Sequence, residues 1–150
     1  MNRREMLFGS AAIAAAVASS GKAFAETMDM SHMHHHHHPS ARNQALLDAA
    51  TDCIQRGEIC MAHCLRLMAT GDTETAECAI SVNQMLAVCE ALQKLAAAES
   101  KYLASQAKVA LELCEACAKE CKKHADKHEE CKACGESCEA CAKECKKLVG

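Results

Sequence analysis

The chain has 150 residues, a length typical of a single domain, and it contains thirteen Cys and eight Met but no Trp, one Tyr and two Phe. Strand-forming residues are sparse and do not alternate with polar ones, which excludes a β-sandwich and favours an all-α fold. The formal net charge of −3 argues against nucleic acid or an anionic membrane as the partner.

Residues 1–25 resemble a secretory signal of the twin-arginine type. Arg3-Arg4 precedes an Ala-rich apolar run that ends near Ala18, and Ala23-Phe24-Ala25 is typical of a cleavage site. The apolar run is too short for a membrane anchor. We therefore predict export by the twin-arginine route to the periplasm or another extracytoplasmic compartment.

Export after folding suits a chain with many thiols, because folding in a reducing cytoplasm avoids scrambled disulfides. Removal of residues 1–25 lowers the basic residues from 17 to 14 and the acidic ones from 20 to 19, which leaves a net charge of −5.

Residues 26–39 are predicted to form a disordered leader that is rich in Met and His. It contains Met28, Met30, Met33, His32 and the run His34–His38. The His run has two interpretations, an engineered tag or a tethered segment that collects copper, since thioether and imidazole groups both suit that metal.

Residues 40–150 are predicted to form four helices joined by short turns. The first runs from an N-cap near Ser40 to about Ala69, and Gly71-Asp72 ends it. Asp72 or Thr73 is expected to cap the second helix, a link around Glu99-Ser100 leads to the third, and the charged stretch 124–130 leads to the fourth. Short connections predict an up-down-up-down antiparallel four-helix bundle.

Each predicted helix carries Cys residues in steps of 3, 4, 7 or 11. Such steps return to nearly the same side of a helix that turns about 100° per residue. The thiols therefore occupy the core-facing positions of a bundle, together with apolar residues. The predicted core-facing positions are Leu46, Ala50, Cys53, Gly57, Cys60, Cys64 and Leu67, then Cys78, Val82, Met85, Cys89, Leu92 and Ala96, then Leu103, Ala107, Ala110, Cys114, Cys117 and Cys121, then Cys131, Cys134, Cys138, Cys141, Cys145 and Leu148.

The predicted topology places most thiols towards one end. We call this end the mouth, where the first and third helices end and the second and fourth begin. Leu and Ala residues fill the opposite end as an apolar plug. His63, Met61 and Met68 on the first helix lie near the mouth, and His124 and His128 flank the turn there. The asymmetry predicts a single entrance for metal. The predicted metal ligands are the thirteen Cys and His63, with Met61, Met68 and His124 as further candidates.

Thirteen thiols facing one core favour multiple Cu(I) ions as the cofactor, because Cu(I) is a soft ion that prefers thiolate ligands. Packing alone gives no reason to choose Cys over Leu, and disulfide scaffolds usually serve small loop-rich folds. Zinc sites that use four thiolates keep two negative charges each, which would be costly when stacked in a core. Disulfides, zinc and iron–sulfur clusters remain weaker alternatives.

Cys134-x-x-x-Cys138-x-x-Cys141 matches the iron–sulfur triad of radical enzymes, but the loop and barrel that such a triad needs are not indicated. The sequence contains no phosphate loop, nucleophile elbow or H-E-x-x-H motif. We therefore expect no enzymatic activity.

These residues resemble the exported copper storage proteins, which are Cys-lined four-helix bundles. The resemblance rests on His63 between Cys60 and Cys64 and on the run from Cys131 to Cys145. It implies a homotetramer, Cu(I) bound by pairs of thiolates, and copper uptake at the open end through a His and several Met. Leu67, Thr70 and Thr75 stand where Met would then be expected, and Met61 and Met68 are possible substitutes. The expected function is storage and supply of Cu(I), with delivery to a copper-accepting protein or a zinc/thiol redox buffer as alternatives.

Overall fold

The computed structural model describes residues 42–149, so the predictions about the signal and the Met/His leader lie outside the described residues. Four helices make up the fold: α1 (Gln44–Ala69), α2 (Ala76–Ala97), α3 (Leu103–Lys122) and α4 (Glu129–Val149). Residues 42–149 contain no strand. The all-α prediction is confirmed.

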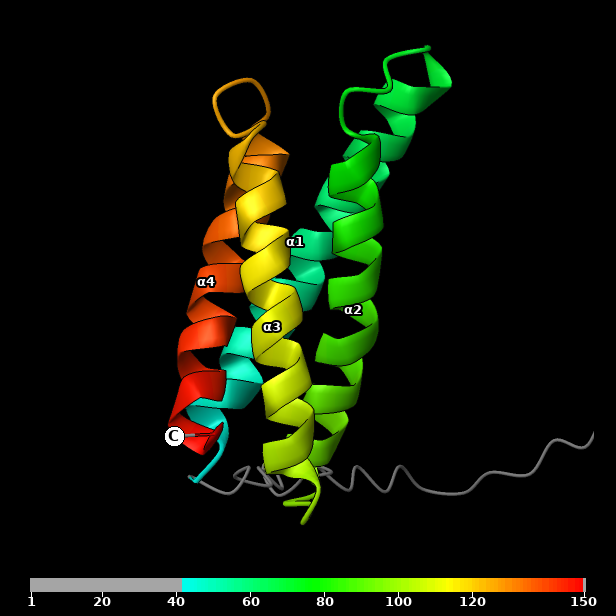
Figure 1. Cartoon of the computed structure of the whole chain (residues 1–150). Coiled ribbons are helices and arrows are strands. Elements are labelled where there is room, and N and C mark those ends of the chain that lie inside the picture. Colours follow the sequence, from blue (N-terminus) through cyan, green and yellow to red (C-terminus); the bar gives the residue numbers. More distant parts are fainter. Residues whose placement is uncertain (1–41, 150) are drawn as a thin grey trace, which may run out of the picture. The chain divides into compact units, whose positions relative to one another are not determined.

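The four helices form an antiparallel bundle in which the backbone of each helix adjoins those of two neighbours, in the cyclic order α1, α2, α3, α4. Figure 1 shows the α1–α2 and α3–α4 turns at one end, where the two helix pairs diverge, and the α2–α3 turn at the other. This arrangement confirms the predicted up-down-up-down topology and places the mouth at the end with two turns.

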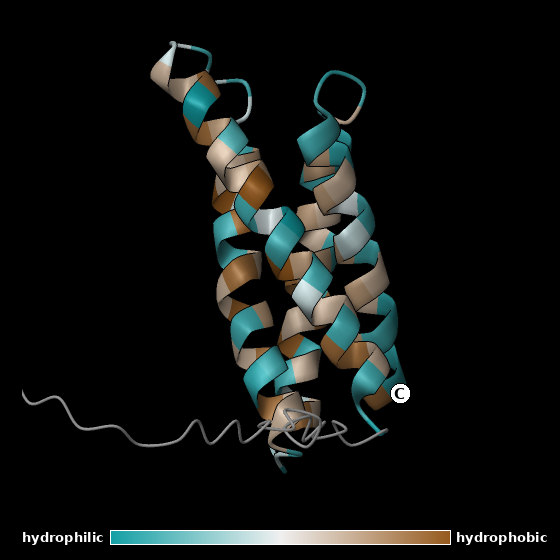
Figure 2. Cartoon of the chain, turned by 180° about the vertical axis from the view of Figure 1, so that it is seen from behind, coloured by the Kyte–Doolittle hydropathy of each residue, from teal (hydrophilic) through white to brown (hydrophobic). Residues whose placement is uncertain are grey.

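The predicted core-facing positions are buried, except that Leu67 and Leu148 are only partly buried. At the end opposite the mouth, Leu46, Leu92 and Leu103 pack with Ala residues into the apolar plug. Hydrophilic residues occupy much of the outer surface and both turns at the mouth (Figure 2). The bundle thus has two kinds of core, an apolar one at the plug and a thiol-lined one towards the mouth.

Helices α1 and α2 end in the same way, with a left-handed residue after the last turn. Gly71 has φ +91°, and the N–H groups of Gly71 and Asp72 donate to Met68 and Leu67. Glu99 takes the equivalent place after α2 with φ 46°. This is the Schellman arrangement, which satisfies the last carbonyls of a helix.

The structure corrects two predicted helix starts. Helix α1 begins at Gln44 rather than near Ser40, because Asn43 is non-helical and its side-chain amide donates instead to the carbonyl of Ala96. Helix α2 begins at Ala76, so neither Asp72 nor Thr73 is its N-cap. The Asp72 carboxylate accepts from the Glu74 N–H and stabilises the preceding turn.

Among residues 42–149, no helix has both the length and the apolar character that crossing a membrane would require.

The plug should support the fold without metal, because neutral thiols pack as small apolar groups. We expect the reduced, metal-free chain to be helical by circular dichroism. Leu92→Ala should then destabilise it by about 2–5 kcal/mol in urea unfolding, because Leu92 is fully buried. Leu65→Ala is the control: Leu65 is 55% exposed and should change the free energy of unfolding by less than about 0.5 kcal/mol. A random-coil spectrum of the reduced apo chain would contradict this account.

Candidate metal centre

All thirteen Cys are free thiols, and each is fully buried. They come from all four helices, at the positions that the spacing predicted. Their sulfur atoms converge on the bundle axis in four groups, each of which has its Sγ atoms within 4.8 Å of one another. The groups, from the mouth inwards, are Cys60, Cys64, Cys78 and Cys131; Cys60, Cys121 and Cys134; Cys117, Cys134 and Cys138; and Cys53, Cys89, Cys114 and Cys141.

The four groups are connected. Cys60 belongs to the first and second groups, and Cys134 belongs to the second and third. The third and fourth are joined by a distance of 3.7 Å between the sulfurs of Cys138 and Cys53. The thiols therefore form one continuous column, which we call the thiol column. Cys145 extends it towards the plug, where its thiol neighbours Cys141.

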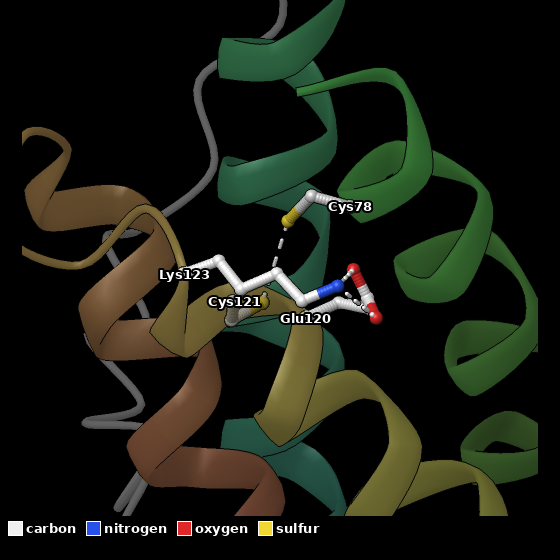
Figure 3. Close-up of polar contacts among 4 residues, drawn as sticks. All are labelled: Cys78, Glu120, Cys121 and Lys123. Atoms are coloured by element: carbon white, nitrogen blue, oxygen red, sulfur yellow. Dashed lines mark hydrogen bonds and ion pairs between the residues drawn. The ribbon is translucent and has the colours of Figure 1, made fainter. Parts of the chain in front are cut away.

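Contacts between helices hold the column together near the mouth. The sulfurs of Cys78 on α2 and Cys121 on α3 are 3.6 Å apart (Figure 3). The nearby ion pair between Glu120 and Lys123, at 2.7 Å, is solvent-accessible on the outside of α3. Charged groups thus stay outside, while soft sulfur donors face the axis.

A polar cluster lies at the mouth, next to the first group of thiols. His63 Nε2 lies 3.0 Å from His128 Nδ1, and His63 Nδ1 lies 3.3 Å from a carboxylate oxygen of Glu130. The predicted ligand His63 is therefore half of a histidine pair. The sequence predicted that His128 lies near the mouth but not that it is a ligand. The spacing gave no indication that Glu130 lies beside His63.

Met61 and Met68 lie elsewhere on α1. They are partly buried and line a groove on the outside of the α1–α2 pair, together with Ile80 and other α2 residues. Met61 and His63 are two residues apart, which places them on nearly opposite sides of the helix. The structure does not bring these Met side chains together with His63.

The other positions considered near the mouth do not join the thiol groups. His124 is partly buried in the turn after α3, and in the part of the chain that the structure describes no thiol group includes it. Leu67 is partly buried, Thr70 is exposed and donates its hydroxyl to the Leu67 carbonyl, and Thr75 is buried at the start of α2.

One further soft donor lies in the column, the thioether of Met85. Met85 is fully buried, and its Sδ is 3.3 Å from Cys53 Sγ. The sequence indicated a buried Met85 but not its nearness to a thiol, because helical periodicity assigns a face and not a neighbour on the next helix.

The thiols of the column differ in pKa. Hydrogen bonding with the thiols of Cys114 and Cys138 lowers the pKa of Cys53 to about 5. Burial, reinforced by the neighbouring sulfurs of Cys60 and Cys78, raises the pKa of Cys64 to about 12. The column therefore mixes thiols that ionise readily with thiols that keep their protons at neutral pH.

Cys60 has a particular place in this pattern. Hydrogen bonding with Cys121 and further thiols around it lowers the pKa of Cys60 below that of an ordinary thiol. Hydrogen bonding with Cys117 and Cys134 raises the pKa of Cys121. A thiolate at Cys60 would thus lie where the first two groups meet, close to the mouth.

Chemically, the column offers sulfur donors without carboxylate or imidazole ligands in its interior. Such a set favours soft ions. Three or four sulfurs within reach of one another can hold an ion in each group, and the shared Cys60 and Cys134 can bridge ions in adjacent groups.

Comparisons with known proteins agree with this geometry. A family model described as "Copper storage protein" (Csp) matches residues 39–150. The structure resembles that of apo copper storage protein 3 (Csp3) from Bacillus subtilis, with a TM-score of 0.64 and 25% identity, over 72% of this chain and 99% of that one.

Two copper-loaded structures share the fold. The Cu(I)-bound form described as BsCsp3 has a TM-score of 0.64 at 24% identity, over 72% of this chain and 98% of that one. The copper storage protein Ccsp from Streptomyces lividans, loaded with 10 copper equivalents, has a TM-score of 0.64 at 24% identity, over 73% of this chain and 87% of that one. No curated protein matches the chain. Because the family model covers every residue of the four helices, this chain belongs to the copper storage protein family.

Proposed function

We propose that this protein stores many Cu(I) ions on the thiol column and supplies copper from it. The observation that carries the proposal is the continuity of the column. Twelve of the thirteen buried thiols belong to the four groups, two of them are shared between groups, and Cys145 neighbours Cys141. A single-site protein would need only one of the four groups. Copper bound to the named relatives supports the same function.

Charge favours Cu(I) over zinc as the stored ion. Cu(I) held by bridging thiolates can approach one ion for each thiolate, which leaves the buried core nearly neutral. Zn²⁺ in four-thiolate sites would leave two negative charges at each site. Within residues 42–149 no Lys or Arg is buried that could offset them. The sharing of Cys60 and Cys134 also suits bridged ions better than separate tetrahedral sites.

We propose in addition that the protein is exported by the twin-arginine route and acts in the periplasm or another extracytoplasmic compartment. The pattern in residues 1–25 supports this. A homotetramer is proposed on the resemblance to the family. Delivery to a copper-accepting protein is the alternative role, because delivery and storage both use exchangeable thiolate sites.

Capacity is the first test. Anaerobic titration of the reduced chain with Cu(I) against a competing chelator should show tight uptake close to one ion for each of the thirteen Cys. A parallel titration with Zn²⁺ should saturate at far fewer ions. Tight uptake of only one or two Cu(I) would contradict storage and favour a chaperone.

The pH dependence of uptake is the second test. Cys64 has a pKa of about 12, so it is protonated at neutral pH and Cu(I) must displace its proton. Lowering the pH therefore weakens binding. From about pH 7.5 to about pH 6.5, the apparent affinity at such thiols should fall about tenfold for each displaced proton. The number of displaced protons can be measured as the protons released into a weak buffer during loading. Loading without proton release would contradict the protonated state assigned to Cys64.

We propose that copper enters at the mouth, where His63 and His128 are the first contacts. Imidazole is a weaker ligand for Cu(I) than thiolate, so it suits a relay that releases what it captures. His63→Ala should slow both loading and chelator-driven removal, measured by stopped flow, while total capacity stays unchanged.

His124→Ala is the matched control for that experiment. It removes an imidazole from the same end of the bundle without touching the His63–His128 contact, and it should leave the rates near those of the unaltered chain. If His63→Ala instead removed the capacity for several ions, His63 would belong to the storage sites and the single entrance would be wrong.

A further inference from the structure

The thiol column has a gap on its α1–α2 side. Cys53 and Cys60 on α1 are seven residues apart, which is about 10 Å along a helix. Between them the core-facing position is Gly57, which has no side chain. At the same level α4 still presents thiols, because Cys138 contacts Cys53 and Cys134 lies in one group with Cys60. Cys117 of α3 lies in one group with both of these α4 thiols.

Met85 of α2 fills this gap. A Cβ atom added to Gly57 would lie only 2.7 Å from the terminal methyl of Met85 and 2.8 Å from Leu86. The bare backbone at Gly57 therefore leaves room for the end of the Met85 side chain between α1 and α2.

Packing alone could explain a buried Met, because its flexible side chain fills irregular spaces. Leu86 also occupies the space beside Gly57, yet only Met85 places a soft donor atom there. Its sulfur lies 3.3 Å from the Sγ atom of Cys53. Cys53 belongs to the group that also holds Cys89, Cys114 and Cys141. Cys89 follows Met85 by one helical turn, on the same face of α2.

We propose that Met85 is a thioether ligand for stored Cu(I), which it holds together with Cys53. The inference rests on the proposed Cu(I) storage. A thioether is neutral and binds without losing a proton, so one thiolate and one thioether balance the single charge of Cu(I). Met85 thereby gives the α1–α2 side of the column a sulfur donor between the deep group and the thiols at the mouth.

X-ray absorption at the selenium edge tests this directly. The full chain is labelled with selenomethionine and loaded with Cu(I). A copper scatterer at bonding distance from selenium is expected, and its amplitude should fall in Met85→Leu. Met61→Leu is the matched control, since Met61 lies in the outer groove, and it should leave the signal at the level of the unaltered chain. An equal signal in Met85→Leu and the unaltered chain would make Met85 a packing residue and overturn the inference.

A second measurement needs no substitution at Met85. In the unaltered chain labelled with carbon-13 in the Met methyl groups, the Met85 methyl is recognised by its proximity to Gly57. Its resonance should move to a new position during Cu(I) loading, and an unmoved resonance at full loading would again overturn the inference. Copper content measured in the same samples separates the two proposals: a fully loaded chain without a Met85 signal refutes only the ligand, whereas uptake of one or two ions refutes storage.

Discussion

The cost of burying charge governs this structure. A thiolate in a dry helical core is expensive, so without metal most thiols must stay protonated and be satisfied by one another, as the pKa of about 12 at Cys64 illustrates. Cu(I) removes this cost by replacing each proton with a bound cation of the same charge. The same core can therefore exist as an array of mostly protonated thiols or as a nearly neutral copper–thiolate array, and the helices need not move apart between the two.

This constraint explains the division of the bundle into two parts. The plug, with Leu46, Leu92 and Leu103, buries ordinary apolar surface and requires no metal. The rest of the core uses small, weakly polar side chains whose role is chemical. In a zinc finger, by contrast, metal binding supplies the folding energy itself. A store that must be both full and empty during its working life needs stability that does not depend on its contents.

The sequence predicted the bundle well because one physical signal, the helical period, controls it. Every Cys was assigned to the core from spacing alone, and the left-handed end at Gly71 follows from its residue type. The contacts that the sequence did not predict are those between residues of different helices or turns. The His63–His128 contact, the carboxylate of Glu130 and the approach of Met85 to Cys53 each require the register of one helix against another. The start of α1 was missed for the same reason, since Asn43 is committed to a carbonyl of α2.

Sharing of Cys60 and Cys134 between groups has a consequence for the order in which ions move. Because the first three groups share sulfurs, and Cys138 of the third lies 3.7 Å from Cys53 of the fourth, an ion can pass inwards by exchanging one ligand at a time, without ever becoming free. With the proposed single entrance at the mouth, the column behaves as a stack: the ion captured last is the first to leave, and the deepest ion must wait for those above it. The copper nearest the plug is then a long-term reserve, while the copper nearest the mouth is the part that leaves first.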